Sequence, residues 1–348
     1  MEDHNYFMQK CIDLAKKGIG NVSPNPLVGS ILVYNGKIVG EGYHEKYGNQ
    51  HAEINAINSV KDKSILKNSI LYVNLEPCSH YGKNPPCSDF IIKHKIPKVI
   101  IGCVDTFSKV NGNGIKRLIN SGVDVKISIL EKECRELNKR FFTFHEKKRP
   151  YIILKWAETY DGFIAPKKQI KPIRISSNRS KSLVHKWRAE EDSILIGRIT
   201  AEMDNPILTV RNYHKGDNPI RIVIDKELKL PSNLNIFNSE SKTLIFNNIK
   251  TDMNNSNSFI KVCFNNLISN ILKELYKLNI QSLIVEGGTI TLESFIKENL
   301  WDEARVFTSK KHLHDGVIAP VIDNSKLSVD KIERYRSNSD VLKIITNK

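Results

Sequence analysis

The sequence predicts an α/β protein of two domains. Short apolar stretches of strand length alternate with segments of helical periodicity, and this alternation is typical of layered α/β domains. With 348 residues, 40% of them hydrophobic and 26% charged, the chain can bury two separate cores. A helical segment of mixed charge runs into Arg149-Pro150, so we place the boundary there, with residues 1–147 and 148–348 as the two domains.

The first domain is expected to open with a helix, a rigid turn and a hairpin. Apolar positions follow a helical period from about His4 to Lys17, where glycines end the helix. The proline-rich turn Ser23–Gly29 leads into strands at 30–33 and 38–42, joined at Asn35-Gly36. The other elements expected here are strands at 69–75 and 98–103 and helices at 88–94, 115–121 and about 131–148.

The second domain continues the alternation. Its expected strands span residues 151–155, 193–197, 221–225 and 282–285, and its expected helices span residues 181–190 and 266–278. The last of these strands runs directly into Glu286-Gly287-Gly288-Thr289, followed by a helix through Phe295. A strand, a diglycine turn and a helix start form a site for an anion, because the backbone N–H groups and the helix dipole attract it. The alternative is a tight turn without a ligand.

Three residues of metal-binding type lie between positions 51 and 87. They are His51, in His51-Ala52-Glu53, and two cysteines that each follow a proline, Cys78 and Cys87. One imidazole and two thiolates suit zinc and leave its fourth position open for water, as in catalytic sites. Zinc lowers the pKa of such a water to about 7. The pattern matches the signature of zinc deaminases, in which the glutamate moves protons.

The spacing of His51 and Glu53 constrains where they lie. Side chains at positions i and i+2 do not share a helix face, so both must border a pocket from the first turn of a helix. Two other interpretations stay open from the residues alone. The cysteines could be buried thiols without a metal, or His80 could complete a closed, structural site as a fourth ligand.

Other polar residues are candidates for substrate contacts. Asn25 is held between two prolines and could present its amide to a flat heterocycle, and His44 precedes the metal motif. In the second domain, Arg188 and Arg211 could bind a phosphate in bidentate fashion, although a single surface arginine is usually only solvated.

The first domain resembles the cytidine-deaminase-like superfamily, and within it the riboflavin-biosynthesis deaminases. The resemblance is carried by Ser23–Gly29, His51-Ala52-Glu53 and the stretch Glu76–Cys87, which has eight residues between its cysteines where nucleic-acid deaminases usually have two. It implies a three-layer domain in which His51, Cys78 and Cys87 bind Zn²⁺ and Glu53 is catalytic.

The second domain resembles the riboflavin-biosynthesis reductases, which have a dihydrofolate-reductase-like fold and use NADPH. The motifs that carry the resemblance include Lys155-Trp156-Ala157, Trp187-Arg188-Ala189, Leu208–Arg211 and Glu286-Gly287-Gly288. The NADPH-binding residues that it implies are Ala157, Arg174, Thr200, Asp204, Gly288, Thr289, Ile290, Thr291, Leu292, Glu293 and Ser294. The implied substrate-binding residues are Lys155, Arg188, Leu208, Arg211 and Glu286. Arg174 stands where family members often have tryptophan, and the segment 167–172 replaces their usual loop of small residues.

Composition indicates the compartment and the class of partner. Six scattered cysteines form no disulfide framework, the N-terminus is polar and acidic, and no apolar run reaches membrane-spanning length, so we expect a cytoplasmic protein. The net charge of +15 is compatible with nucleic acid and with phosphorylated small molecules. Because the lysines are spread along the chain, we expect the small molecule, with neither nucleic acid nor a membrane as a partner.

We therefore expect a bifunctional enzyme of riboflavin synthesis. It would hydrolytically deaminate 2,5-diamino-6-ribosylamino-4(3H)-pyrimidinone 5′-phosphate with Zn²⁺ and then reduce the ribosyl group to ribityl with NADPH. A homo-oligomer is left open. One alternative is a tRNA deaminase with a basic binding appendage, which should show clustered cations and stacking aromatics. Another is a non-catalytic module stabilised by zinc.

Overall fold

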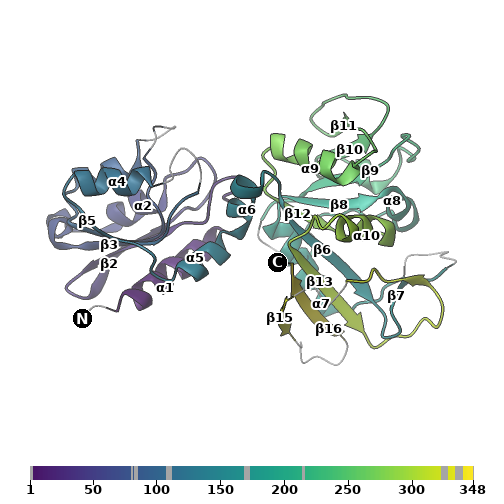
Figure 1. Ribbon diagram of the computed structural model, residues 1–348, viewed down its shortest axis with the longest axis horizontal. Coiled ribbons are helices and arrows are strands. Elements are labelled where there is room, and N and C mark those ends of the chain that lie inside the picture. The colour runs from purple at the N-terminus through teal and green to yellow at the C-terminus, as the bar shows by residue number, and fades with distance from the viewer. Residues whose placement is uncertain are drawn as a thin grey trace. The chain divides into compact units, whose positions relative to one another are not determined.

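The computed structural model (Figure 1) divides into two compact units, Met1–Lys148 and Arg149–Lys348. The division lies one residue from the boundary placed by the sequence. The structure describes residues 3–79, 81, 85–106, 112–167, 173–213, 216–322, 328–333 and 340–347, the side chains of 328–333 excepted. The alternative ligand His80 and most of the 167–172 segment lie outside these residues.

The N-terminal unit is a three-layer α/β domain. Its five-stranded sheet has the order β2 (Lys37–Tyr43), β1 (Gly29–Tyr34), β3 (Ile70–Leu75), β4 (Lys98–Cys103), β5 (Asp124–Lys126). Helix α1 (His4–Ala15) packs with α5 (Glu131–Leu137) and α6 (Lys139–Lys147) on one face. Helices α2 (Ala52–Ser59), α3 (Cys87–Lys93) and α4 (Asn113–Asn120) cover the other face. The three layers confirm the expected domain type.

The strand directions in this sheet bring functional segments to one edge. Strand β1 is antiparallel to both β2 and β3, whereas β3, β4 and β5 run parallel. The carboxyl ends of β3 and β4 therefore lie side by side, so Cys78 and Asp105 follow at the same edge of the sheet. The expected hairpin turn is present, with positive φ at both Asn35 (49°) and Gly36 (71°), as a type I′ turn requires.

The helix expected over residues 131–148 is wrong as a single element. It divides into α5 and α6 at Asn138, whose φ of −101° and ψ of 21° depart from helical values. The side chain of Asn138 does not point along a helix surface to solvent but bonds to the backbone of Leu27. A tertiary contact therefore overrides the local helical preference at this residue.

The C-terminal unit is built on a nine-stranded sheet, β11-β10-β9-β8-β12-β6-β13-β16-β15. Strands from β11 to β13 pair in parallel, and β16 and β15 add antiparallel partners at one edge (Figure 1). The strands are β6 (Tyr151–Glu158), β8 (Ser193–Gly197), β9 (Ile220–Ile224), β10 (Thr243–Asn247), β11 (Asn257–Lys261), β12 (Ser282–Val285), β13 (Glu303–Ser309), β15 (Ser328–Glu333) and β16 (Asp340–Thr346). A separate pair joins β7 (Phe163–Ala165) to β14 (Val317–Ile318).

Helices cover both faces of this sheet. Helices α9 (Leu267–Lys277) and α10 (Thr289–Lys297) pack into the core on one face. Helices α7 (Asn178–Glu190) and α8 (Arg198–Asp204) pack into the core on the other. Within the part of the chain that the structure describes, no helix has the length and apolar character needed to cross a membrane.

The sequence expectation did not include the strands β10, β11, β13, β15 and β16. Strand β13 illustrates why, because it carries the buried charged residues Glu303 and Arg305 among its apolar ones. The Arg305 Nε atom donates to Glu303 at 2.6 Å, and Tyr151 donates to the other oxygen of Glu303 at 2.9 Å. This pairing, which local sequence does not reveal, lets the charges occupy a buried strand.

Candidate active sites

Three side chains of metal-binding type meet at the edge formed by β3, α2 and α3. The ligand atoms of His51, Cys78 and Cys87 all lie within 4.8 Å of one another. The His51 Nδ1 atom is 3.3 Å from the Cys87 sulfur and 3.5 Å from the Cys78 sulfur. Tetrahedral zinc places nitrogen and sulfur ligands about 3.6 Å apart. The donor set and its spacing therefore fit zinc, with three protein ligands among the described residues.

Each ligand is placed by the end of a secondary-structure element. His51 is the N-cap residue of α2, Cys87 is the first residue of α3, and Cys78 follows the end of β3 by three residues. The Cys87 amide donates to the Cys78 sulfur at 3.3 Å, and the Ser88 amide donates to the Cys78 carbonyl at 3.2 Å. Hydrogen bonding from the Cys87 thiol and then from His51 lowers the pKa of Cys78. This favours the thiolate, which is the form that binds metal.

Glu53 lies in the first turn of α2, as the spacing predicted, and only 3% of its surface is exposed. Burial raises the pKa of Glu53 to about 7, and the nearby His51 charge partly offsets the effect. A bound divalent cation would oppose the effect of burial and lower this pKa, because an opposite charge favours the carboxylate. Glu53 is therefore suited to accept and return a proton near neutral pH.

Asn25 and His44 meet beside the metal ligands. The Asn25 amide nitrogen is 3.1 Å from His44 Nε2, and His44 Nδ1 is 3.1 Å from the Gln50 carbonyl oxygen. A carbonyl only accepts, so Nδ1 carries the proton and Nε2 accepts from Asn25. Burial lowers the pKa of His44, which favours this neutral form. The His44 and His51 rings are 5.5 Å apart, so the pair borders the metal site.

Glu76 has a structural role that the sequence motif alone did not reveal. Its buried carboxylate accepts four backbone N–H groups, from Asp105 (3.2 Å), Gly112 (3.0 Å), Gly114 (2.9 Å) and Ile115 (3.3 Å). Three of these donors belong to the start of α4, where a negative charge is favourable. The signal in the sequence is a glutamate at the end of an apolar strand, directly before Pro77-Cys78.

The second site lies at the carboxyl ends of the central parallel strands in the C-terminal unit, the usual ligand position in open α/β sheets. Glu286 follows β12 directly, and its carboxylate is 3.0 Å from Arg188 of α7 and 3.9 Å from Lys155 of β6. All three side chains are at least four-fifths buried. Two cations and one anion leave this cluster with a net positive charge, which suits a phosphorylated substrate.

His185 also belongs to this cluster, although the sequence expectation omitted it. It lies one helical turn before Arg188 on α7, and its Nδ1 accepts the Arg211 backbone N–H at 3.1 Å. Burial, with the charges of Arg188 and Arg211, lowers the pKa of His185 to about 4. The ring is therefore neutral and fixes the backbone of Arg211, whose side chain is exposed.

Two helix starts lie against each other at the same sheet edge. The Gly197 amide donates to the Gly287 carbonyl at 2.9 Å, which joins the loop before α8 to the loop before α10. A Cβ atom added to Gly197 would lie 2.7 Å from the Thr291 hydroxyl, and one added to Gly288 would lie 3.1 Å from the Thr200 hydroxyl. The two threonines thus lie in close contact with glycines of the opposite segment, where a side chain would not fit. The backbone N–H groups at the start of α10 can bind an anion such as a dinucleotide phosphate.

The remaining cofactor candidates differ in how accessible they are. Asp204 lies four residues after Thr200, on the same face of α8, and Ala157 is half-buried near the end of β6. On α10, Ile290 is 73% exposed and Glu293 is exposed, whereas the Ser294 hydroxyl donates to the Ile290 carbonyl. Thr289 donates to the Ile318 carbonyl at 3.1 Å. Arg174 is exposed, and its carbonyl accepts from Lys311.

Two of the residues named from the resemblance have side chains in the core. Leu292 is fully buried in the core on the α9 and α10 face, and Leu208 is 2% exposed in the core on the other face. Leu208 has a φ of 59°, a left-handed value that is unusual for leucine. Their side chains therefore act by supporting the loop and helix rather than by presenting a polar group.

The comparisons with known proteins follow the same division of the chain. The family model for the cytidine and deoxycytidylate deaminase zinc-binding region matches residues 1–103, and that for the RibD C-terminal domain matches residues 150–317. The chain is 39% identical to the riboflavin biosynthesis protein RibD of Aquifex aeolicus over 347 residues, which cover 95% of each chain. The chain belongs to the RibD family.

Other RibD proteins agree along the whole length. The protein of that name from Synechocystis is 36% identical over 90% of this chain and 86% of its own. The crystal structure of the Thermotoga maritima diaminohydroxyphosphoribosylaminopyrimidine deaminase/5-amino-6-(5-phosphoribosylamino)uracil reductase superposes with a TM-score of 0.89, at 33% identity, over 99% of both chains. Acinetobacter baumannii RibD superposes with a TM-score of 0.88, at 27% identity, over 99% of both chains.

Family membership confirms the expected fold classes and activities. The chain is a bifunctional enzyme of riboflavin biosynthesis, with a zinc-dependent deaminase in its cytidine-deaminase-like domain and an NADPH-dependent reductase in its dihydrofolate-reductase-like domain. The expected cofactors, Zn²⁺ and NADPH, are confirmed with it, and the cluster at His51 is a suitable zinc site.

The charge cluster of the reductase should matter for stability as well as for activity. Burial alone raises the pKa of Glu286, but Arg188 and Lys155 outweigh burial and hold the pKa at about 2. Removing one member of a buried ion pair costs about 3 kcal/mol or more. We expect Glu286→Gln to destabilise the C-terminal unit by that amount at pH 7 and to lower reductase activity, while deaminase activity persists.

The contribution of Glu286 to the free energy of unfolding should depend on pH in a defined direction. Because the folded-state pKa of Glu286 lies below the ordinary value of 4.5, its contribution is complete above pH 4.5 and is lost as the pH falls towards 2. The free energy of unfolding, measured with denaturant, should therefore be higher for the wild type than for Glu286→Gln by an amount that is constant from pH 7 to 5. This difference should narrow below pH 4.5. Exposed Glu298→Gln is the matched control, and a difference that does not depend on pH would contradict the assignment.

Proposed function

We propose that the deaminase substrate is 2,5-diamino-6-ribosylamino-4(3H)-pyrimidinone 5′-phosphate, and that the reductase converts the ribosyl group of the product to ribityl. The observation that carries the first step is the three-ligand cluster with buried Glu53 beside it. The cationic cluster of Arg188, Lys155 and Glu286 supports the second, because it suits a phosphorylated sugar. The RibD relatives support the order of the two steps.

In the deaminase, zinc held by His51, Cys78 and Cys87 would supply a water that is acidic enough to react at neutral pH. Glu53 would take one proton from the attacking water and pass it to the ring nitrogen. It would then take the remaining hydroxyl proton and pass it to the leaving amino group as the carbon–nitrogen bond breaks, so one water is consumed and one ammonia is released. Asn25 and His44 hold the pyrimidine ring, with the neutral His44 keeping the Asn25 amide oriented.

In the reductase, bound NADPH would supply the hydride that reduces the sugar C1′, while the bond from C1′ to the ring oxygen opens and that oxygen takes a proton from solvent. Lys155 and Glu286 lie across neighbouring strands at the sheet edge, and we assign them to orienting the sugar. Arg188 and Arg211 bind the substrate, and the exposed guanidinium of Arg211 is the one suited to the phosphate. We assign Thr200 and Asp204 of α8, together with the start of α10, to holding the cofactor.

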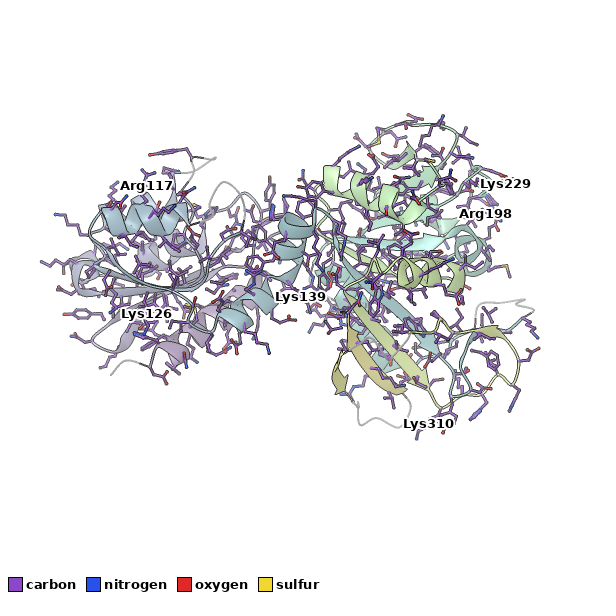
Figure 2. All side chains as sticks on the ribbon, in the orientation of Figure 1. Arg117, Lys126, Lys139, Arg198, Lys229 and Lys310 are labelled. Carbon is purple, nitrogen blue, oxygen red and sulfur yellow. The ribbon has the colours of Figure 1, made fainter. Side chains whose placement is uncertain are left out.

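The surface charge gives no preference to the nucleic-acid alternative. Figure 2 labels six cations that project from separate parts of the two units rather than from one patch. They are Arg117 on α4, Lys126 on β5, Lys139 on α6, Arg198 on α8, Lys229 after β9 and Lys310 after β13. Several pair with nearby carboxylates, for example Arg117 with Asp89 and Arg198 with Glu202. A small phosphorylated pyrimidine needs no extended basic surface.

Incubation of the full-length protein with the diaminopyrimidine ribosyl phosphate tests the proposal. We expect ammonia release without NADPH, and NADPH oxidation only after deamination has supplied the reductase substrate. Ammonia release without any later NADPH oxidation would refute the reductase step, and Arg174 would be the first residue to examine. A tRNA arm in the same assay tests the alternative, which requires ammonia from tRNA and none from the mononucleotide.

A further inference from the structure

Two buried asparagines hold the backbone of one residue in the proline-rich turn of the deaminase. Asn138 accepts the Leu27 N–H at 2.8 Å and donates to the Leu27 carbonyl at 2.9 Å. Asn74 donates to the same carbonyl at 3.0 Å and accepts the Gly29 N–H at 2.8 Å. These amides replace the backbone partners that this irregular segment, just before β1, lacks.

The two asparagines reach this segment from separate elements. Asn74 lies on β3 and is fully buried, and Asn138 lies at the joint between α5 and α6 and is 2% exposed. Asn138 is 111 residues from Leu27 in the sequence. The backbone N–H of Asn138 still donates to the Cys134 and Arg135 carbonyls. The chain therefore keeps part of its helical bonding while the Asn138 side chain turns towards the segment.

The segment that they hold carries the two candidate pyrimidine contacts. Asn25 lies two residues before Leu27, and its amide bonds to His44. The His44 backbone N–H donates to the Val28 carbonyl at 2.9 Å, one residue after Leu27. Both contacts therefore depend on where the backbone of residues 25–29 lies, whereas Glu53 and the metal ligands belong to other elements.

We infer that Asn74 and Asn138 are positioning residues for the pyrimidine subsite. They touch no substrate; they fix the Leu27–Gly29 backbone so that Asn25 and His44 are already in place when the substrate binds. This inference rests on the proposed role of Asn25 and His44 in binding the pyrimidine. Without the asparagines, the segment would have to be ordered at each binding event, and that cost weakens binding.

The expected result is a change in the KM of the deaminase without a comparable change in its kcat. For Asn138→Ala and for Asn74→Ala, we expect KM for the diaminopyrimidine to rise about tenfold, the equivalent of one net hydrogen bond. We expect kcat to stay within about twofold, because Glu53 and the metal ligands keep their own supports. Zinc content and the reductase activity of the same molecules should be unchanged. Exposed Asn68→Ala is the matched control and should leave every constant unchanged.

A double-mutant cycle separates positioning from a general structural role. Once Asn25→Ala has removed the amide, Asn138 can act on KM only through His44, so Asn25→Ala/Asn138→Ala should raise KM by less than the product of the two single effects. A KM in the double variant that rises by the full product of the two single effects would overturn the inference. Equal loss of kcat and of zinc in Asn138→Ala would also overturn it, since that result indicates a disrupted metal site.

A further variant and two controls distinguish a failure of this inference from a failure of the proposed function. If the alanine variants do not fold, Asn138→Asp keeps the shape and the acceptor for the Leu27 N–H but loses the donor to the Leu27 carbonyl and places a carboxylate oxygen beside it. A KM equal to the wild type in soluble Asn138→Asp would overturn the inference. If Asn25→Ala itself leaves KM unchanged, the proposed substrate contact fails instead. If the wild type releases no ammonia, the proposed function fails.

Discussion

Glu53→Gln is expected to abolish ammonia release while zinc remains bound. Glutamine keeps the size of the side chain but can neither accept the proton of the attacking water nor return it to the leaving group. General acid–base groups contribute about 10²- to 10⁴-fold to a rate, and Glu53 serves several proton transfers, so we expect a loss of about 10³-fold or more in kcat. The measurement is steady-state ammonia release, with zinc determined on the same samples.

The reductase of the same molecule serves as an internal control for Glu53→Gln. NADPH oxidation with the deaminated substrate should proceed at the wild-type rate, because the reductase site lies in the other compact unit. Exposed Glu41→Gln on β2 should leave both activities unchanged. Deamination by Glu53→Gln at more than a tenth of the wild-type rate would contradict the role assigned to Glu53.

Cys87→Ala is expected to remove both zinc and deaminase activity. Two ligands remain in the variant, and a pair of side chains cannot hold zinc as three do. Zinc bound after dialysis should fall from near stoichiometric to a small fraction, and ammonia release should become undetectable. Because Cys87 is fully buried at the start of α3, the N-terminal unit should also lose thermal stability.

Two comparisons make the loss of zinc specific. Cys263→Ala removes an exposed cysteine and should keep both the zinc and the deaminase activity. The reductase activity of Cys87→Ala should persist with added deaminated substrate. Full zinc retention in Cys87→Ala would mean that this thiol is not a ligand.

The zinc motif could be predicted because each functional residue lies next to a local signal. His51 and Glu53 stand at a helix start, and the prolines before Cys78 and Cys87 mark the ends of a strand and a loop. The first-turn placement followed from the two-residue spacing alone. In the second domain, Glu286 was correctly predicted to follow an apolar strand directly. Its position near Lys155 of the neighbouring strand β6 was not predicted.

The residues that support these sites could not be predicted in the same way. Asn138 lies within a helical pattern, and only the distant Leu27 backbone explains its conformation. The acceptor role of Glu76 depends on backbone N–H groups 29 to 39 residues away. Local periodicity carries no information about such pairings, because they depend on which elements the completed fold brings together.

Metal analysis combined with X-ray absorption spectroscopy of the full-length protein gives the most direct test of an open zinc site. We expect near-stoichiometric zinc coordinated by two sulfur atoms, one imidazole nitrogen and one further oxygen from water. A protein purified without zinc, or a metal coordinated by four protein side chains, would contradict the assignment of the N-terminal unit as a deaminase.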